Sequence, residues 1–258
     1  MKKIIILFLI ISGILLALGT NRGTAQEKLT ADQIMHRVDS RPIPKDLTAE
    51  MAMNLIDRKG QVRQRTVKTL RMGDDKQIMW FLLPADVKGS SFLRISYEDR
   101  EDDMWLYLPA FGKVRRIASH TKKGNFMGTD FTFEDLGDRK LGDYAYRLVK
   151  EEKVGEKSCW VVESTPNKGV STDYSRIVSW IWKDEYIPLR EEFYDGSAAL
   201  RKVMTMELTQ LKKYWVPKRV LMEDLKAAHK TAMIFDKIDV DTGLSEKIFD
   251  TSSLTRIY

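Results

Sequence analysis

A long succession of short segments in which apolar and polar residues alternate constrains the fold of this 258-residue chain more than any other feature. Alternation with a period of two places the apolar side chains on one face of a β-strand. Turn-forming residues such as Asp57-Arg58-Lys59-Gly60 separate the segments. Strands are expected at residues 51–55, 62–72, 78–83, 92–97, 104–108, 146–151, 158–164, 177–183, 189–194, 203–211, 220–225 and 231–238. Because few helical segments interrupt them, they predict a single antiparallel sheet in a mainly β protein with a few helices (α+β).

Two further elements are predicted outside the strands. Thr30, with Gln33 three residues later and an apolar stripe from Ile34, has the pattern of a capped helix, which should end before Pro42. Residues 245–249 are typical of a short capped turn that packs back on the sheet, although a frayed terminus is the alternative.

The N-terminal segment has the pattern of an export signal. A basic start is followed by an almost unbroken apolar run over residues 4–18 and by small residues that end at Ala25. The run is shorter than the roughly 20 residues of a membrane-spanning helix, which disfavours an anchor. We therefore expect a signal peptide at residues 1–25, one domain at residues 26–258, and secretion across the inner membrane into a bacterial periplasm.

Net charge argues against a nucleic-acid-binding protein, and cysteine content argues against a disulfide-stabilised one. Removing the signal takes away three of the 43 basic residues and none of the 37 acidic ones, so the net charge falls from +6 to +3. That balance argues against nucleic-acid binding. The single cysteine, Cys159, permits no internal disulfide, and its apolar surroundings indicate a small buried side chain rather than a nucleophile.

Motifs for catalysis or metal binding are absent from the sequence. His36, His120 and His229 lie far apart, and no metal-binding, serine-hydrolase or phosphate-loop pattern occurs. No catalytic residue, metal or cofactor is therefore predicted, and the protein is expected not to be an enzyme. Residues 98–103 are acidic except for Arg100, which indicates a solvated turn. A hydrolase that uses only carboxylates remains the alternative.

The apolar residues indicate a possible ligand. Twelve methionines and six tryptophans occur, many of them in the alternating segments. Flexible thioethers and broad aromatic faces suit a cavity for flexible apolar ligands. Plain core packing explains the same composition equally well.

Three segments carry a resemblance to a known family: Leu-Tyr-Leu-Pro-Ala at 106–110, Lys-Val-Arg-Arg-Ile at 113–117, and Asn-Phe-Met-Gly-Thr-Asp-Phe-Thr-Phe-Glu-Asp at 125–135. The chain resembles outer membrane lipoprotein-sorting proteins over about residues 30–256, and in particular the LolA-like branch often found beside exporters of the resistance-nodulation-division (RND) type. The resemblance implies a LolA/LolB-like incomplete (half) β-barrel, whose apolar concave face is covered by short helices and loops. By analogy of fold, that hollow would carry the acyl chains of lipoproteins.

Eight residues that alternate with polar neighbours are predicted to line the apolar cavity and bind ligand. They are Met51, Met53, Trp80, Leu82, Trp105, Met204, Met206 and Leu208. An error of one residue in the register of any strand would move its residues to the opposite face.

The segment from Gly124 to Asp135 is predicted to form a lid or rim over this hollow. Gly124 and Gly128 permit tight turns, and alternation places two phenylalanines opposite the neighbouring polar residues. The lid residues would be Phe126, Met127, Phe131 and Phe133. Ordinary core packing of these side chains is the alternative.

Charged residues of the same region are expected to have two roles. Asp130, Glu134 and Asp135 would tie the lid down through Arg115 or Arg116. The basic residues predicted to contact lipid headgroups or an acidic partner are Arg115, Arg116, Lys122 and Lys123.

The function that these observations predict is a periplasmic carrier of lipid acyl chains or lipidated protein. It would act in outer membrane lipoprotein sorting or lipid transport with a membrane transporter, such as an inner-membrane RND-type protein. The alternative is an interaction or sensor module that docks on an RND-type exporter and binds no lipid.

Overall fold

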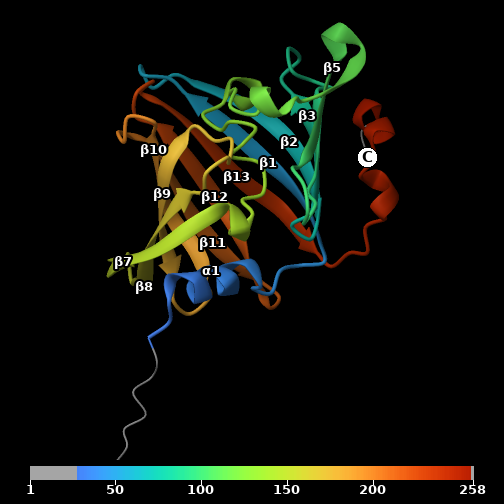
Figure 1. The fold of residues 1–258 in the computed structure, drawn as a ribbon. Coiled ribbons are helices and arrows are strands. Elements are labelled where there is room, and N and C mark those ends of the chain that lie inside the picture. Colours follow the sequence, from blue (N-terminus) through green and yellow to red (C-terminus); the bar gives the residue numbers. More distant parts are fainter. Residues whose placement is uncertain (1–27, 257–258) are drawn as a thin grey trace, which may run out of the picture.

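The computed structural model describes residues 28–256 as one antiparallel sheet of thirteen strands with a single α-helix (Figure 1). The strands are β1 (Asp46–Ile56), β2 (Val62–Met72), β3 (Lys76–Leu83), β4 (Ser91–Ile95), β5 (Asp103–Leu108), β6 (Lys113–Arg116), β7 (Tyr144–Val154), β8 (Lys157–Pro166), β9 (Tyr174–Trp182), β10 (Ile187–Asp195), β11 (Leu200–Leu211), β12 (Tyr214–Asp224) and β13 (His229–Val240). The predicted signal peptide, residues 1–25, lies outside the described residues. Within residues 28–256, no helix is long and apolar enough to cross a membrane.

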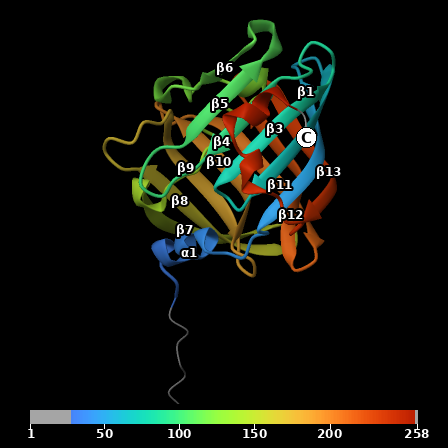
Figure 2. The same cartoon turned by 90° about the vertical axis from the view of Figure 1, so that its right-hand side faces the viewer.

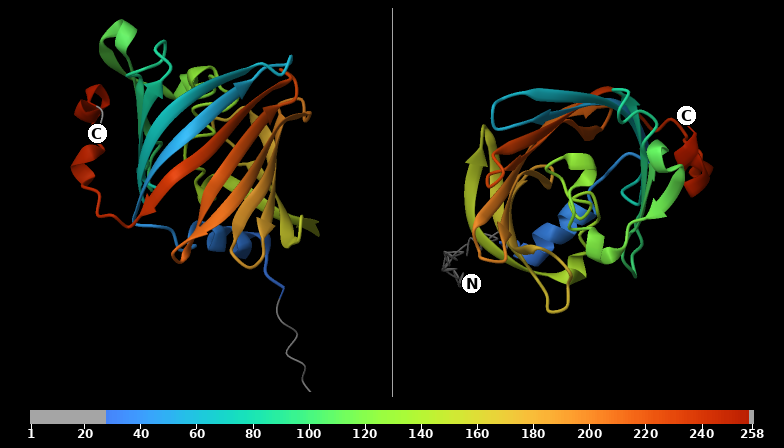
Figure 3. Two further views of the ribbon diagram at one scale, coloured as in Figure 1. Left: turned by 180° about the vertical axis from the view of Figure 1, so that it is seen from behind. Right: turned by 90° about the horizontal axis from the view of Figure 1, so that it is seen from above.

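The sheet consists of two meanders that meet in its middle. β1 to β6 form one meander and β7 to β13 the other, and β1 pairs with β13 to join them. β6 and β7 are therefore the two outer edges. The sheet curls strongly without closing, and the chain between β6 and β7 spans the opening (Figure 3). The predicted half-barrel is confirmed.

The helix α1 (Ala31–Asp39) begins as predicted. Thr30 accepts a hydrogen bond from the Gln33 backbone, and the Gln33 side chain accepts one from the Thr30 backbone, which completes a capping box. Ile34 is fully buried and packs in one cluster with Val162 of β8 and Ile181 of β9. The helix thus lies across one end of the curled sheet (Figures 1 and 3).

The C-terminal segment covers part of the convex face. Two 3-10 turns, η5 (Glu246–Ile248) and η6 (Thr251–Thr255), lie outside the sheet over β3 to β5 (Figure 2). Phe249 and Leu254 are buried there against Trp80, whose indole Nε1 donates a hydrogen bond to the Ser253 carbonyl at 3.1 Å. The predicted terminal turn that packs on the sheet is confirmed.

Candidate functional site: a plugged concave face

Methionines line the concave face of the sheet in adjacent rows. Residues directly opposite each other on neighbouring strands share a face. One row comprises Met204, Met222, Thr231 and Leu55 on β11, β12, β13 and β1. The next row comprises Met206, Val220, Met233, Met53 and Arg65. This surface is apolar and adaptable, because thioether side chains fit many shapes.

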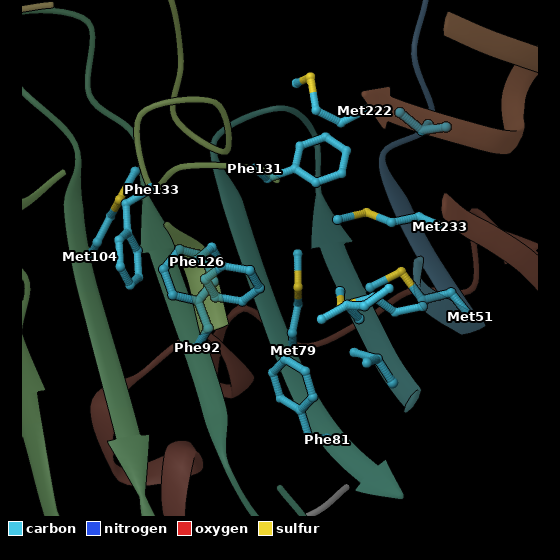
Figure 4. Close-up of a cluster of buried hydrophobic side chains, with 14 of the residues drawn as sticks. Met51, Met79, Phe81, Phe92, Met104, Phe126, Phe131, Phe133, Met222 and Met233 are labelled. Atoms are coloured by element: carbon cyan, nitrogen blue, oxygen red, sulfur yellow. The ribbon is translucent and has the colours of Figure 1, made fainter. Parts of the chain in front are cut away.

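Residues 125–136, which we call the plug, fill the space in front of these rows. Phe126, Phe131 and Phe133 are 0, 3 and 8% exposed and belong to the same cluster as the sheet methionines. Phe126 meets Phe92 of β4 edge-on, with ring centroids 5.1 Å apart. In Figure 4, Phe131 points toward methionines of β12 and β13. Three of the four predicted lid side chains therefore lie in the interior, while Met127 is partly buried against it.

A buried ion pair fastens the plug to β11. The Lys202 ammonium lies 3.0 Å from the Asp135 carboxylate, and the two side chains are 1 and 2% exposed. Tyr174 of β9 donates its hydroxyl to the other oxygen of Asp135 at 2.8 Å, and the Thr132 backbone N–H donates at 2.8 Å. Burial, together with the Asp135 charge, raises the pKa of Tyr174 above its usual range, so the hydroxyl stays protonated and donates.

A second anchor holds the plug on β13. Thr231 donates its hydroxyl to the Asp130 carboxylate at 2.6 Å and accepts the Asp130 backbone N–H at 3.0 Å. His229 Nδ1 lies 2.8 Å from the same carboxylate. The segment is thus tied to the sheet at both of its aspartates.

A third anchor comes from β2, and a fourth lies outside the sheet. Arg65 donates to the Met127 carbonyl at 2.7 Å, and burial lowers the pKa of this guanidinium. Glu134 accepts a hydrogen bond from the Thr172 hydroxyl, and burial raises the pKa of its carboxyl group. The plug is therefore held by polar contacts as well as by apolar packing.

The predicted tie through Arg115 or Arg116 is wrong. Both belong to β6, an edge strand whose four residues are exposed. The Arg116 Nε donates to Asp103 at 3.1 Å, and the Arg115 guanidinium lies 4.8 Å from the centre of the Phe111 ring. Edge position, rather than charge, decides which partners these residues can reach.

The other two predicted contact residues are engaged in local ion pairs. Lys122 pairs with Glu101 at 3.1 Å, and Lys123 pairs with Asp173 at 2.9 Å. Of the four basic residues, only Arg115 has no carboxylate partner among the described residues.

The predicted cavity residues divide between clusters. Met51, Met53, Met204 and Met206 belong to the concave cluster. Trp80, Leu82 and Trp105 instead lie in the convex cluster under the C-terminal segment, which corrects their predicted placement. Residues 78–83 are all apolar, and no polar residue marks an outer face. Alternation therefore could not distinguish the two faces of β3.

Leu208 is also placed differently from its prediction. It packs near Trp180 and Trp182 in a separate cluster, not with Met206. The pairing of β11 with β12 shifts register between Glu207 and Leu208. Such an irregularity breaks the alternation that the prediction assumed.

Sequence reasoning missed the residues of the sheet that hold the plug, which are Arg65, Tyr174, Lys202, His229 and Thr231. The sequence could have identified Lys202, because Lys202, Met204 and Met206 follow one another at intervals of two residues and therefore lie on the same face of the strand. A charged residue in phase with an apolar row indicates a buried partner. No pattern in the sequence identified that partner as Asp135.

A polar cleft of about 780 Å³ lies beside the plug, between residues 98–102, 137–144 and 167–171. Its lining is largely charged and includes both acids and bases. No group of three or more histidine, cysteine or carboxylate side chains in residues 28–256 is arranged to hold a metal ion. The cleft lacks the apolar lining that an acyl chain requires.

The acidic run at residues 98–103 is less solvated than predicted. Asp102 and Asp103 are both 7% exposed. Asp102 pairs with Arg94 at 3.2 Å, and Asp103 pairs with Arg100 at 2.8 Å. Ion pairing compensates the burial of these two carboxylates.

The carboxylates of the cleft differ in their pKa shifts, since burial raises the pKa of Glu134 while the pKa values of Glu101 and Asp138 are lowered. A hydrogen bond from Ser119 and a second from Lys122 lower the pKa of Glu101. Burial works to raise the pKa of Asp138, but the hydrogen bond and charge of Lys140, together with the Arg94 charge and a hydrogen bond from Ser96, lower it overall. A general acid needs a raised pKa, so Glu101 and Asp138 are poorly suited to that role, and Glu134 is engaged by the Thr172 hydroxyl.

The open, curled sheet with a covered concave face defines a half-barrel of the LolA type. Residues 73–256 match a family model described as "Uncharacterized protein". A DUF1329 family protein from Desulfovibrio piger is similar over 87% of this chain and 97% of its own, with 32% identity and a TM-score of 0.81. A domain from Vibrio parahaemolyticus described as a "putative outer membrane lipoprotein-sorting protein" is similar over 88% of this chain and 98% of its own, with 33% identity and a TM-score of 0.80.

The chain therefore belongs to the same family as the DUF1329 protein and the putative outer membrane lipoprotein-sorting protein domain, which confirms the predicted resemblance to outer membrane lipoprotein-sorting proteins. A LolA superfamily protein from Nitrosomonas europaea shares the fold at 20% identity, with a TM-score of 0.68 over 88% of this chain and all of its own. No curated protein matches the chain.

Proposed function

We propose that this protein is a periplasmic, non-enzymatic carrier that binds lipid acyl chains or lipidated protein on its concave face. The observation that carries the proposal is the plug, an irregular segment that covers rows of methionines and is held by side-chain anchors rather than by strand pairing. The relative from Vibrio parahaemolyticus, whose description refers to lipoprotein sorting, supports the same class of cargo.

The proposed cycle exchanges the plug for cargo. Plug and acyl chain compete for one surface, since the phenylalanines already occupy the concave space. Each methylene group buried there would contribute about 0.8 kcal/mol, so a chain of ordinary length can offset the loss of the plug contacts. Opening of a covering segment is the conformational step that such exchange requires.

Delivery to or from a membrane transporter of the RND type is part of the proposal. The exposed β6 edge, together with Phe111, which lies two residues before it and is 56% exposed, supports contact with a membrane headgroup or an acidic partner near Arg115. Reversal of charge at Arg115 should weaken that contact. Unchanged binding would remove this part of the proposal.

The proposal is tested by titrating the mature protein with a fatty acid that carries an environment-sensitive fluorophore. Saturable uptake at one site, displaced by unlabelled fatty acid, is expected. A protein that takes up no probe would favour the alternative, a docking module that binds no lipid in its working cycle.

A further inference from the structure

The methionine rows end in a polar row at one margin of the concave face. Lys202, Asp224 and His229 lie directly opposite one another on β11, β12 and β13. Asp224 Oδ1 accepts hydrogen bonds from the backbone N–H groups of Lys226 and Ala227, and its Oδ2 lies 3.7 Å from the Arg201 guanidinium. Lys202 and His229 remain as donors two strand spacings apart, or about 10 Å.

The plug satisfies both donors with carboxylates. Asp135 lies on Lys202 and Asp130 lies on His229, each at hydrogen-bond distance. Between these two aspartates, Phe131 packs among the methionines of the next rows (Figure 4). The plug therefore presents anionic groups to the polar row and apolar groups to the methionines, as an acyl chain with an anionic headgroup would.

Departure of the plug would leave Lys202 without its counter-ion. An ammonium group that is 1% exposed is unfavourable when unpaired. The nearby Glu191 does not supply a replacement, since Arg139 at 2.6 Å and the Ser179 hydroxyl at 2.7 Å already bind it. Arg139 lies beyond the end of the plug, so that pair can persist when the plug leaves.

We propose that the cargo is an anionic amphiphile, whose carboxylate or phosphate headgroup replaces Asp135 and Asp130 at Lys202 and His229 while its acyl chain covers the methionine rows. The inference rests on the carrier function proposed above and specifies its cargo. A neutral diacylglyceryl group, in contrast, would leave Lys202 unpaired.

The test compares ligands that share one sixteen-carbon chain: hexadecanoic acid, 16:0 lysophosphatidic acid and the neutral 1-monopalmitoylglycerol. Their affinities are measured below micelle concentrations by displacement of a fluorescent fatty acid from the mature protein. The wild type should bind at least one anionic ligand about tenfold more tightly than the neutral one, as expected for one charge-assisted hydrogen bond. The two anionic ligands distinguish a carboxylate from a phosphate headgroup.

Variants assign the preference to the polar row. The double variant Lys202→Met with Asp135→Asn removes both charges of the pair, so no unpaired buried charge remains, and its preference should disappear. Lys202→Arg should retain it. The matched control, Lys237→Met with Glu50→Gln, removes an exposed ion pair of β13 and β1 and should bind like the wild type.

The two proposals fail in different ways. Equal affinity of the wild type for anionic and neutral ligands, or an unchanged preference in the Lys202→Met, Asp135→Asn protein, would overturn the inference and leave the carrier function standing. Binding of none of the three ligands, together with no uptake of the fluorescent fatty acid, would overturn both.

Discussion

Replacing Lys202 with methionine should release the plug selectively. The substitution leaves the Asp135 carboxylate, which is 2% exposed, without its counter-ion. Removing one partner of a buried ion pair costs about 3–5 kcal/mol. The Tyr174 hydroxyl and the Thr132 backbone N–H still bind Asp135, so the lower end, about 3 kcal/mol, applies.

The lost stabilisation should favour opening of the plug and should leave the unfolding of the sheet unchanged. Asp135 regains water when residues 125–136 leave the concave face, whereas the strand pairing of β11 stays intact. A change of about 3 kcal/mol raises the population of the open plug roughly a hundredfold. Amide hydrogen exchange in residues 125–136, followed by mass spectrometry, should accelerate by about that factor.

The matched double variant, Lys202→Met with Asp135→Asn, should restore most of the protection because no charge is left unpaired. Peptides from β12 and from the C-terminal segment serve as internal controls. Equal acceleration in all peptides would refute the reasoning, because it would mean that the ion pair stabilises the whole fold. Unchanged exchange in residues 125–136 would refute it as well.

Three further predictions concern other residues. Phe131→Ala should lower the free energy of unfolding by about 3–5 kcal/mol in urea titrations and accelerate uptake of the fluorescent fatty acid. Phe249→Ala, in the convex cluster, should destabilise comparably without changing uptake; faster uptake in both proteins would contradict the plug assignment. A hydrogen bond from Arg100, the largest influence, and another from Arg116 lower the pKa of Asp103 from 3.8 to about 2. Its contribution to stability should be complete above pH 3.8 and be lost as the pH falls to about 2; a carboxyl ¹³C titration midpoint near 3.8 would contradict this.

Local signals made the order of elements predictable. The capping box at Thr30 and Gln33 identified α1, and turn residues after Ile56 separated β1 from β2. The chain also alternates clearly in β1, where every second residue from Leu47 to Leu55 is buried. Such signals depend on neighbouring residues only, which a single sequence contains.

The faces of β3 and the anchors of the plug required information that no local pattern contains. In β3, Met79 faces the concave side and Trp80 the convex side, and only the distant C-terminal segment explains why both are buried. The Lys202–Asp135 contact joins residues that are 67 positions apart. Long-range pairing of this kind follows from the curl of the sheet, and the spacing of charges along the chain does not predict it.

Lipid extraction and native mass spectrometry of residues 26–258, the predicted mature protein, purified without detergent from its proposed location in the periplasm, test the carrier function most directly. Stoichiometric acyl species are expected, and their removal should increase the hydrogen-exchange protection of residues 125–136 as the plug returns. An empty protein that also fails to acquire lipid from membranes of its host would contradict it.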